Sequence, residues 1–298
     1  MFRGSIVALV TPMTADEALD YSALERLLSF HISEGTQGVV IAGTTGESPT
    51  LSGKELEGLV GRAVEICAGR IPVIGGSGTN STARTVKLTR RVARAGADAA
   101  LVVTPYYNKP TQRGLLAHYT AVADAAGLPV ILYNVPGRTG CDLQPETAAA
   151  LAAHPAIVGL KEATPGTERL ARLKELCPED FCLLSGDDAT GCEFMLAGGW
   201  GVISVTANAA PGLMRQACDA ALSGQSEQAG AIDERLSGLH AAMFLEPNPI
   251  PVKWAVARLG LIGEGIRLPL TWLDDQFHPA VASAMKAAGL QIEVQGRT

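Results

Sequence analysis

The sequence has no long hydrophobic run and no block of charge of either sign. Nowhere do about 20 apolar residues follow one another without interruption, so we expect no transmembrane helix. The apolar stretch before Thr11 is too short for the hydrophobic region of a secretion signal. Lys and Arg number 24 against 30 Asp and Glu, a net charge of -6 spread along the chain. We therefore expect a soluble, untargeted protein with no membrane or nucleic-acid partner.

The cysteines and histidines lack the spacing of a redox pair or a metal site. The six cysteines include no Cys-x-x-Cys, in a chain of 298 residues that is too long to need disulfide staples. We expect reduced, mostly buried thiols and a cytoplasmic protein. The five histidines form neither His-x-His nor His-Glu-x-x-His, so we expect no metal site.

Glycine-rich phosphate loops are also missing from the expected places. The nearest candidate for a Gly-x-Gly-x-x-Gly loop, residues 76–81, has Ser81 where the third glycine belongs. Gly198 and Gly199 come before an apolar run and not after it. The phosphate loop common after the last two strands of a barrel is therefore not evident, and a phosphosugar substrate loses support.

Eight short apolar runs are present, separated by segments with helical apolar spacing. Hydrophobic residues make up 47% of the chain, enough to bury a large core. A strand-helix rhythm with a period of about 25 to 35 residues favours a parallel sheet closed into a (β/α)8 TIM barrel, with a doubly wound open sheet as the rival. The predicted strands are 6–10, 39–42, 72–75, 99–103, 130–133, 157–161, 181–185 and 202–205.

After Pro211 the strand rhythm stops and the pattern becomes helical. No long linker separates this part from the strands before it. We predict a barrel over 1–223 and a C-terminal helical extension over 224–298 that packs against it. The predicted helices of the extension are 227–244, 252–259 and 279–288.

One predicted strand ends in a lysine. Residues 156–160 are uncharged and mostly apolar, which indicates a strand buried on both faces. Lys161 then lies at the carboxyl end of that strand, where active sites of such barrels are found. Desolvation of an ammonium favours the neutral amine, which attacks a carbonyl and forms an imine. Lys161 is thus the candidate nucleophile, although a lone lysine in this position more often caps a strand in solvent.

Other predicted strands deliver polar side chains to the same end of the barrel. Thr44 and Thr45 stand between glycines after the second strand, where they hold a small carboxylate or form an ordinary turn. Tyr133 ends the fifth strand, and its phenol can exchange a proton. Arg138, on the Pro-Gly turn that follows, offers a planar fork to a carboxylate or is a surface residue.

Three further strand ends carry weaker signals. Tyr106 and Tyr107 lie between two prolines, as exposed phenols or as packing. Asp187 and Asp188 favour a helix N-cap and first turn over a pair of acid/base carboxylates. We expect the backbone of residues 202–208, from the eighth strand, to line the pocket. A lysine, phenols, hydroxyls and an arginine on one ring of strand ends are what a class I carbonyl condensation or cleavage requires.

Five motifs span most of the chain: GTTGE, YYNKP, YNVPGRTG, GLKEA and EPNPIPVK. They begin at Gly43, Tyr106, Tyr133, Gly159 and Glu246. Together they resemble the dihydrodipicolinate synthase family, and the resemblance runs from Ser5 to about Gly289. That family belongs to the pyruvate-dependent class I aldolases, which also contain N-acetylneuraminate lyase. The double threonine and the arginine after YNVPG, both present here, separate the synthase from the sugar-acid aldolases.

The resemblance implies a role for each catalytic residue. Lys161 forms the imine with pyruvate. Tyr133 protonates and deprotonates the imine and enamine. Thr44 relays protons between Tyr133 and Tyr107, and Tyr107 comes from the neighbouring subunit of a tight dimer.

The resemblance also implies how the substrates bind. Thr45 and the backbone of Ile203 hold the pyruvate carboxylate, and Arg138 receives the carboxylate of L-aspartate 4-semialdehyde. The implied reaction makes 4-hydroxy-tetrahydrodipicolinate for lysine and diaminopimelate, without a cofactor, in a homotetramer built as a dimer of dimers. Two alternatives remain: a related aldolase acting on a sugar acid, and a binding paralogue without catalysis, which the complete residue set disfavours.

An effector pocket implied by the resemblance is altered in this chain. In members sensitive to L-lysine the pocket corresponds to Ser48, Pro49, Gly53, Leu56, Asn80, Arg84 and Tyr106. Sensitive members have histidines at Gly53 and Leu56 and a glutamate at Arg84. An ammonium about 4 Å from a guanidinium meets a repulsion of roughly 4 kcal/mol at an effective dielectric of about 20. Unless Glu55 or Glu57 compensates, we predict a vestigial pocket and little inhibition by lysine.

Overall fold

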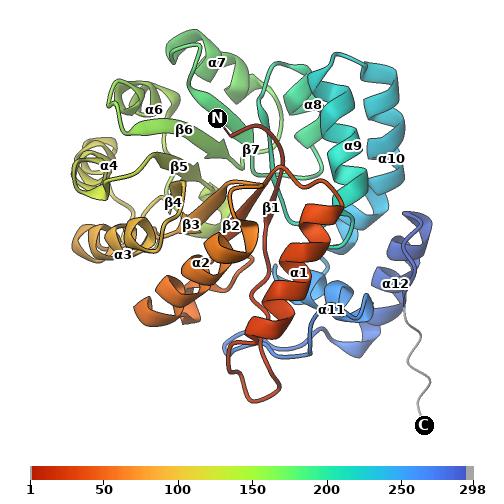
Figure 1. Ribbon diagram of the computed structural model, residues 1–298. Coiled ribbons are helices and arrows are strands. Elements are labelled where there is room, and N and C mark those ends of the chain that lie inside the picture. The colour runs from red at the N-terminus through yellow and green to blue at the C-terminus, as the bar shows by residue number, and fades with distance from the viewer. Residues whose placement is uncertain (1, 293–298) are drawn as a thin grey trace.

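The computed structural model describes residues 2–292 and contains a closed barrel of eight parallel strands (Figure 1). Each strand pairs with the next along the chain, and the last pairs with the first. The predicted TIM barrel is thereby confirmed and the open sheet excluded. The strands are β1 Gly4–Ala8, β2 Gly38–Ile41, β3 Val73–Gly76, β4 Ala99–Val103, β5 Val130–Asn134, β6 Ile157–Glu162, β7 Cys182–Ser185 and β8 Gly201–Ser204.

The strand boundaries agree with the predicted ones to within one residue, except for β1, which begins and ends two residues earlier than predicted. The apolar pattern continues past the end of β1 because Val10 is buried although it has left the sheet. Its N–H donates to Oδ1 of Asn208 at 2.9 Å and not to a neighbouring strand. Burial and strand pairing separate here, so an apolar run alone misplaces the end of the strand.

The helices lie around the outside of the strands (Figure 1). Local signals start several of them: Asp20 accepts a hydrogen bond from Ala23 N before the first, and Ser52 and Glu55 form a capping box on the second. The helices that accompany the barrel are α1 Tyr21–Ser33, α2 Gly53–Cys67, α3 Thr82–Arg94, α4 Gln112–Ala126, α5 Pro136–Thr139, α6 Pro145–Ala152, α7 Glu168–Leu176, α8 Gly191–Leu196 and α9 Pro211–Leu222. Among residues 2–292 every helix is too short or too polar to span a bilayer.

The strands separate two apolar layers. Along β5, Ile131 and Tyr133 belong to the cluster inside the barrel, and Val130 and Leu132 belong to the larger cluster under the helices. This alternation follows from the two-residue period of a strand. The next residue, Asn134, is fully buried and continues the outer series. At the end of β5, Tyr133 therefore faces the inside of the barrel, and the polar side chain of Asn134 lies on the outer side of the strand.

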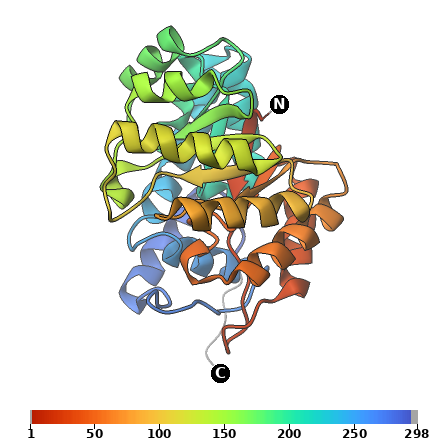
Figure 2. The same ribbon diagram turned by 90° about the vertical axis from the view of Figure 1, so that its left-hand side faces the viewer.

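Three helices follow the barrel: α10 Ser226–Ala242, α11 Ile250–Arg258 and α12 His278–Ala287. They match the predicted helices to within two residues. The predicted boundary between barrel and extension falls in the turn between α9 and α10, and α10 packs on both α9 and α12. In Figures 1 and 2 the blue loop between α11 and α12 reaches the red loop before α1, and Arg267 Nη2 donates to Glu17 O at 2.9 Å.

Candidate active site

A cavity of about 120 Å³ opens at the carboxyl ends of the strands. It is lined by Lys161 from β6, Tyr133 from β5, Thr44 and Thr45 from the turn after β2, and Arg138 from α5. The structure thus brings together five side chains that lie far apart in the sequence. Parallel strands end at one edge of the barrel, which explains why strand-end residues meet there.

Lys161 is buried, with 5% of its surface exposed. Its Nζ lies 4.3 Å from the centroid of the Tyr133 ring. Among residues 2–292 the amine has no hydrogen-bond or ion-pair partner, so its nitrogen is available to a ligand. Gly186 borders the lysine stem, and a Cβ at Gly186 would lie 2.9 Å from Lys161 Cε. Only glycine leaves this lysine its present position.

The threonine turn is compact and partly buried. Gly46 N and Ser48 N both donate to Gly43 O, at 3.1 and 3.2 Å. Thr45 is 2% exposed, and its Oγ1 accepts a hydrogen bond from Asn248 Nδ2 at 3.0 Å. Asn248 also lines the cavity, and its Oδ1 is buried without a hydrogen-bond partner. The threonine hydroxyls of the turn and the side-chain amide of Asn248 therefore face the same small cavity.

A buried ion pair fixes the end of this turn. Glu47 and Lys253 have fully buried side chains that contact each other, and Glu47 Oε2 also accepts from Arg267 N at 3.1 Å. Burial lowers the pKa of the Lys253 ammonium, and the carboxylate of Glu47 offsets part of that change. The pair joins the GTTGE motif to the EPNPIPVK motif, which lie more than half the chain apart.

Arg138 is the exposed cation at the mouth of the cavity. Its Nη2 donates to Asn248 O at 3.5 Å, and among residues 2–292 no carboxylate pairs with it. The guanidinium is therefore free to meet an anionic ligand. Arg138 and Thr44 also line a second cavity of about 260 Å³.

The second cavity contains most of the predicted effector residues. Ser48, Arg84 and Tyr106 line it. Asn80 is not among its lining residues, and Asn80 O accepts from Asn108 Nδ2 at 2.8 Å. Pro49 and Leu56 line it too, so five of the seven predicted residues lie at one hollow next to the active-site cavity, without Gly53 and Asn80.

Two predicted site residues do not line the active-site cavity of this chain. Tyr107 is 87% exposed, and its backbone N donates to Thr139 O at 3.2 Å, so the phenol is held facing outward. Ile203 is fully buried in the cluster inside the barrel. Val205, two residues further on, borders the cavity instead.

Asp187 and Asp188 do not cap a helix directly, so that prediction is wrong in its detail. The residue at the N-cap of α8 is Thr190. Asp187 lies in the turn before this helix, and its Oδ2 accepts from Thr190 N and Oγ1 at 3.1 and 2.7 Å. Asp188 Oδ2 accepts from Val205 N at 2.9 Å and from Thr206 N at 2.8 Å. Asp188 therefore ties the segment after β7 to the segment after β8, a long-range contact that local sequence does not reveal.

None of the six thiols lines the active-site cavity. All six cysteines are free, and burial raises the pKa of Cys67 and Cys177 to about 11. Within residues 2–292 no three His, Cys, Asp or Glu side chains gather as a metal site would require. Sequence reasoning gave no role to Asn248, Phe244 or Gly186, which also line the cavity. The one signal for Asn248 was its place in the EPNPIPVK motif.

Comparison with known proteins extends over the whole chain. Residues 1–288 match the model of the Dihydrodipicolinate synthetase family. A 4-hydroxy-tetrahydrodipicolinate synthase from Methylococcus capsulatus is 58% identical over 97% of this chain and 100% of the relative. The crystal structure of a chloride-inhibited dihydrodipicolinate synthase from Acinetobacter baumannii with pyruvate has a TM-score of 0.96, with 48% identity over 98% and 100% of the chains. The Cyanidioschyzon merolae enzyme with lysine bound has a TM-score of 0.94, with 40% identity over 97% and 99%.

Proposed function

The chain belongs to the Dihydrodipicolinate synthetase family, and from this premise we propose that it condenses pyruvate with L-aspartate 4-semialdehyde through an imine on Lys161. The product is 4-hydroxy-tetrahydrodipicolinate. The observation that carries the proposal is the unpartnered amine of Lys161 beside the Tyr133 ring, in a cavity that also holds threonine hydroxyls and a free guanidinium.

The first half of the reaction forms an imine. The neutral amine of Lys161 attacks the keto carbon of pyruvate, and the carbinolamine loses water to give the imine. Tyr133 supplies the proton that the departing hydroxyl requires and takes one back later. Thr45 and the backbone at Ile203 are the proposed contacts of the pyruvate carboxylate. The placement of Thr45 on the cavity wall supports this role, and no metal or organic cofactor is needed for any of these steps.

The second half forms the carbon-carbon bond. Removal of a methyl proton converts the imine to an enamine, whose carbon attacks the aldehyde carbon of the second substrate. Arg138 holds the carboxylate of that substrate as a charge-assisted pair. The substrate's own amine then displaces Lys161 by transimination and closes the ring, which returns the free lysine.

The proton relay requires a second copy of the chain. Thr44 lies on the cavity wall, but the phenol of Tyr107 is exposed in the single chain, as expected of a group that completes a neighbour's site. We infer an assembly of dimers in which Tyr107 of one chain reaches Thr44 of its partner, with the homotetramer as the full form. A cytoplasmic location is part of the same proposal.

The test is turnover with defined aldehydes. The protein is incubated with pyruvate and either L-aspartate 4-semialdehyde or a polyol aldehyde, and pyruvate consumption is followed. We expect turnover with the semialdehyde and none in Lys161→Ala, while Lys54→Ala, which removes an exposed lysine on α2, behaves as the unaltered protein. Turnover of only the polyol aldehyde would identify a sugar-acid aldolase. Turnover of neither would overturn the proposed activity.

A further inference from the structure

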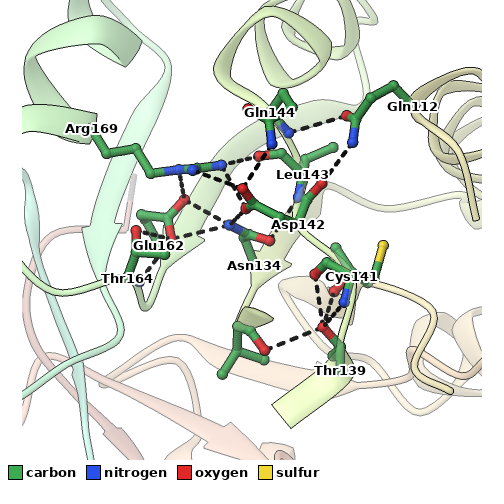
Figure 3. Close-up of polar contacts among 12 residues, drawn as sticks. Gln112, Asn134, Thr139, Cys141, Asp142, Leu143, Gln144, Glu162, Thr164 and Arg169 are labelled. Atoms are coloured by element: carbon green, nitrogen blue, oxygen red, sulfur yellow. Dashed lines mark hydrogen bonds and ion pairs between the residues drawn. The ribbon is translucent and has the colours of Figure 1, made fainter. Parts of the chain in front are cut away.

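A buried polar network lies behind the strand ends that carry Tyr133 and Lys161 (Figure 3). Tyr133 pairs in register with Lys161, and the next residues, Asn134 and Glu162, pair in register with each other. Strand alternation turns this second pair away from the active-site cavity. Asn134 Nδ2 lies 3.2 and 3.1 Å from the two carboxylate oxygens of Glu162. The catalytic pair and the polar pair are thus consecutive rungs of one ladder.

Both carboxylate oxygens of Glu162 accept hydrogen bonds from other groups of the protein. Its side chain is 1% exposed. Oε1 accepts from Thr164 N at 2.9 Å and from Thr164 Oγ1 at 2.7 Å, and Oε2 accepts from Arg169 Nε at 2.8 Å. A buried carboxylate with all these donors in place has a structural purpose. Glu162 is therefore not the acid or base of the reaction, although it follows Lys161 in the sequence.

Arg169, at the start of α7, connects the end of β6 to a different segment. Its two terminal nitrogens donate to the two carboxylate oxygens of Asp142, at 3.1 and 2.9 Å. The same guanidinium donates to Leu143 O. One planar group therefore bridges Glu162 and residues 142–143, with the bidentate geometry that distinguishes arginine from lysine.

Asn134 closes the loop that begins after it. Its Oδ1 accepts from Leu143 N at 2.9 Å, and its Nδ2 donates to Asp142 Oδ1 at 2.8 Å. The far end of the segment 135–143 is thus attached to the side chain of the residue that precedes the segment. Gln112 Nε2 adds a contact to Asp142 O at 2.7 Å from the start of α4.

This loop carries Arg138, the proposed contact of the second substrate. Arg138 lies within it, and Thr139 O holds Tyr107 through the backbone N–H of that residue. Inside the loop, Thr139 Oγ1 accepts from Cys141 N at 3.2 Å (Figure 3). The loop is therefore a small fixed frame and not a free surface turn.

We propose that Asn134, Glu162, Arg169 and Asp142 are positioning residues that hold the loop 135–143, and with it Arg138, at a fixed place relative to Lys161. The inference rests on the proposed function, in which Arg138 binds the aldehyde substrate. None of the four residues lines either cavity described above, so they act through the loop. Carbon-carbon bond formation is sensitive to small displacements of the second substrate, whereas imine formation at Lys161 does not involve Arg138.

The variant Arg169→Met removes the guanidinium that bridges Glu162 and Asp142. We expect the KM for L-aspartate 4-semialdehyde to rise about tenfold or more, while the KM for pyruvate and the rate of borohydride-trapped imine formation change by less than about twofold. The control is Arg172→Met on the same helix, which removes contacts to Glu146 and Glu175 at the surface and should alter neither KM. A merely structural role would lower the amount of active enzyme without separating the two substrates. Equal changes in both KM values, or none, would overturn the proposal.

A double variant tests whether the network acts through Arg138. In an Arg138→Ala background, Arg169→Met should add less than about twofold to the loss with the aldehyde, because the positioned group is already gone. A persistent tenfold effect would contradict the inference. If Arg169→Met does not fold, Gln112→Ala provides a milder change, and a rise in the aldehyde KM alone is again the expected result. Failure of the proposed function would instead appear in the unaltered protein, as absent turnover.

Discussion

The amine of Lys161 and the guanidinium of Arg138 are the two basic groups of the described residues that line the active-site cavity, and neither pairs with a carboxylate. They differ in surroundings, because Lys161 is buried and Arg138 is exposed at the mouth. A nucleophile that reacts inside the cavity can be buried, whereas a clamp for an incoming carboxylate requires access. The two residues therefore serve different substrates in this account.

Replacing Arg138 should affect only one of those substrates. Loss of a charge-assisted contact in a partly dry site costs on the order of 2 to 4 kcal/mol. Arg138→Ala should therefore lower kcat/KM for the aldehyde by the factor that corresponds to this loss of transition-state stabilisation. Imine formation with pyruvate should survive. Steady-state kinetics with each substrate varied in turn measure both effects. Loss of pyruvate trapping with an unchanged aldehyde KM would show that Arg138 binds pyruvate instead.

Site residues could be predicted from the sequence where the side chain lies at or just after the end of a strand. Thr44, Tyr133 and Lys161 stand at strand ends, and parallel strands bring their ends together. Asn248 could not be assigned in this way, because it reaches the cavity from a segment after the barrel. Nor could the burial of Asn134 behind the site, which depends on partners from β6 and from the far end of a loop.

At the scale of elements, the turn after β2 and the start of α11 are joined by the ion pair of Glu47 and Lys253. Both motifs are visible in the sequence, but nothing in either predicts that one holds the other. Side-chain pairs separated by more than 200 residues depend on the folded barrel. Both charges of the pair are buried away from water, and burying either charge without the other would be unfavourable.

Removing one partner of this pair should destabilise the protein strongly. Lys253→Met leaves the Glu47 carboxylate buried without its cation and should cost about 3 to 5 kcal/mol in the free energy of unfolding. The double variant Glu47→Gln with Lys253→Met should recover most of that loss, because no uncompensated charge remains. Urea denaturation of the three proteins tests this. Equal stability of the single variant and the unaltered protein would contradict it.

A buried histidine on α1 should make the stability depend on pH. Burial lowers the pKa of His31 from 6.5 to about 3, so the folded protein leaves this imidazole neutral in mild acid while the unfolded chain binds a proton. Stability from this group is complete above the unfolded value of 6.5 and falls as the pH drops, by up to about 1.4 kcal/mol per pH unit. The urea midpoint measured from about pH 7 to about pH 5 should fall less steeply in His31→Gln. An identical slope in that variant would contradict the assignment.

At the scale of the whole molecule, the barrel could be predicted because strands buried on both faces give continuous apolar runs, while the helices between them give a different period. The number and order of strands then determine the closed topology. What the pattern does not contain is the proposed contact between chains. Tyr107 reads the same in the sequence whether its phenol packs inside its own chain or projects outward, as it does here.

Regulation also belongs to this scale, and we predict that millimolar lysine barely inhibits the protein. Compensation of Arg84 by neighbouring acids is not available, because Glu55 pairs with Arg267 and Glu57 pairs with Arg91, both at 2.5 Å. The Arg267 guanidinium lowers the pKa of Glu55 to about 2, which keeps that pair charged. Initial rates at subsaturating pyruvate, with and without lysine, measure the effect. Strong inhibition that disappears in Tyr106→Ala or Asn80→Ala would show a working lysine site.

The most direct test of the central claim is the mass of the intact chain after incubation with pyruvate and borohydride. We predict a single reduced pyruvate adduct, mapped to the peptide that contains Lys161, and the same adduct in Lys54→Ala. Lys161→Ala should remain unmodified under the same conditions. An adduct that persists in Lys161→Ala, or an unaltered protein that acquires none, would contradict the assignment of Lys161 as the imine-forming residue.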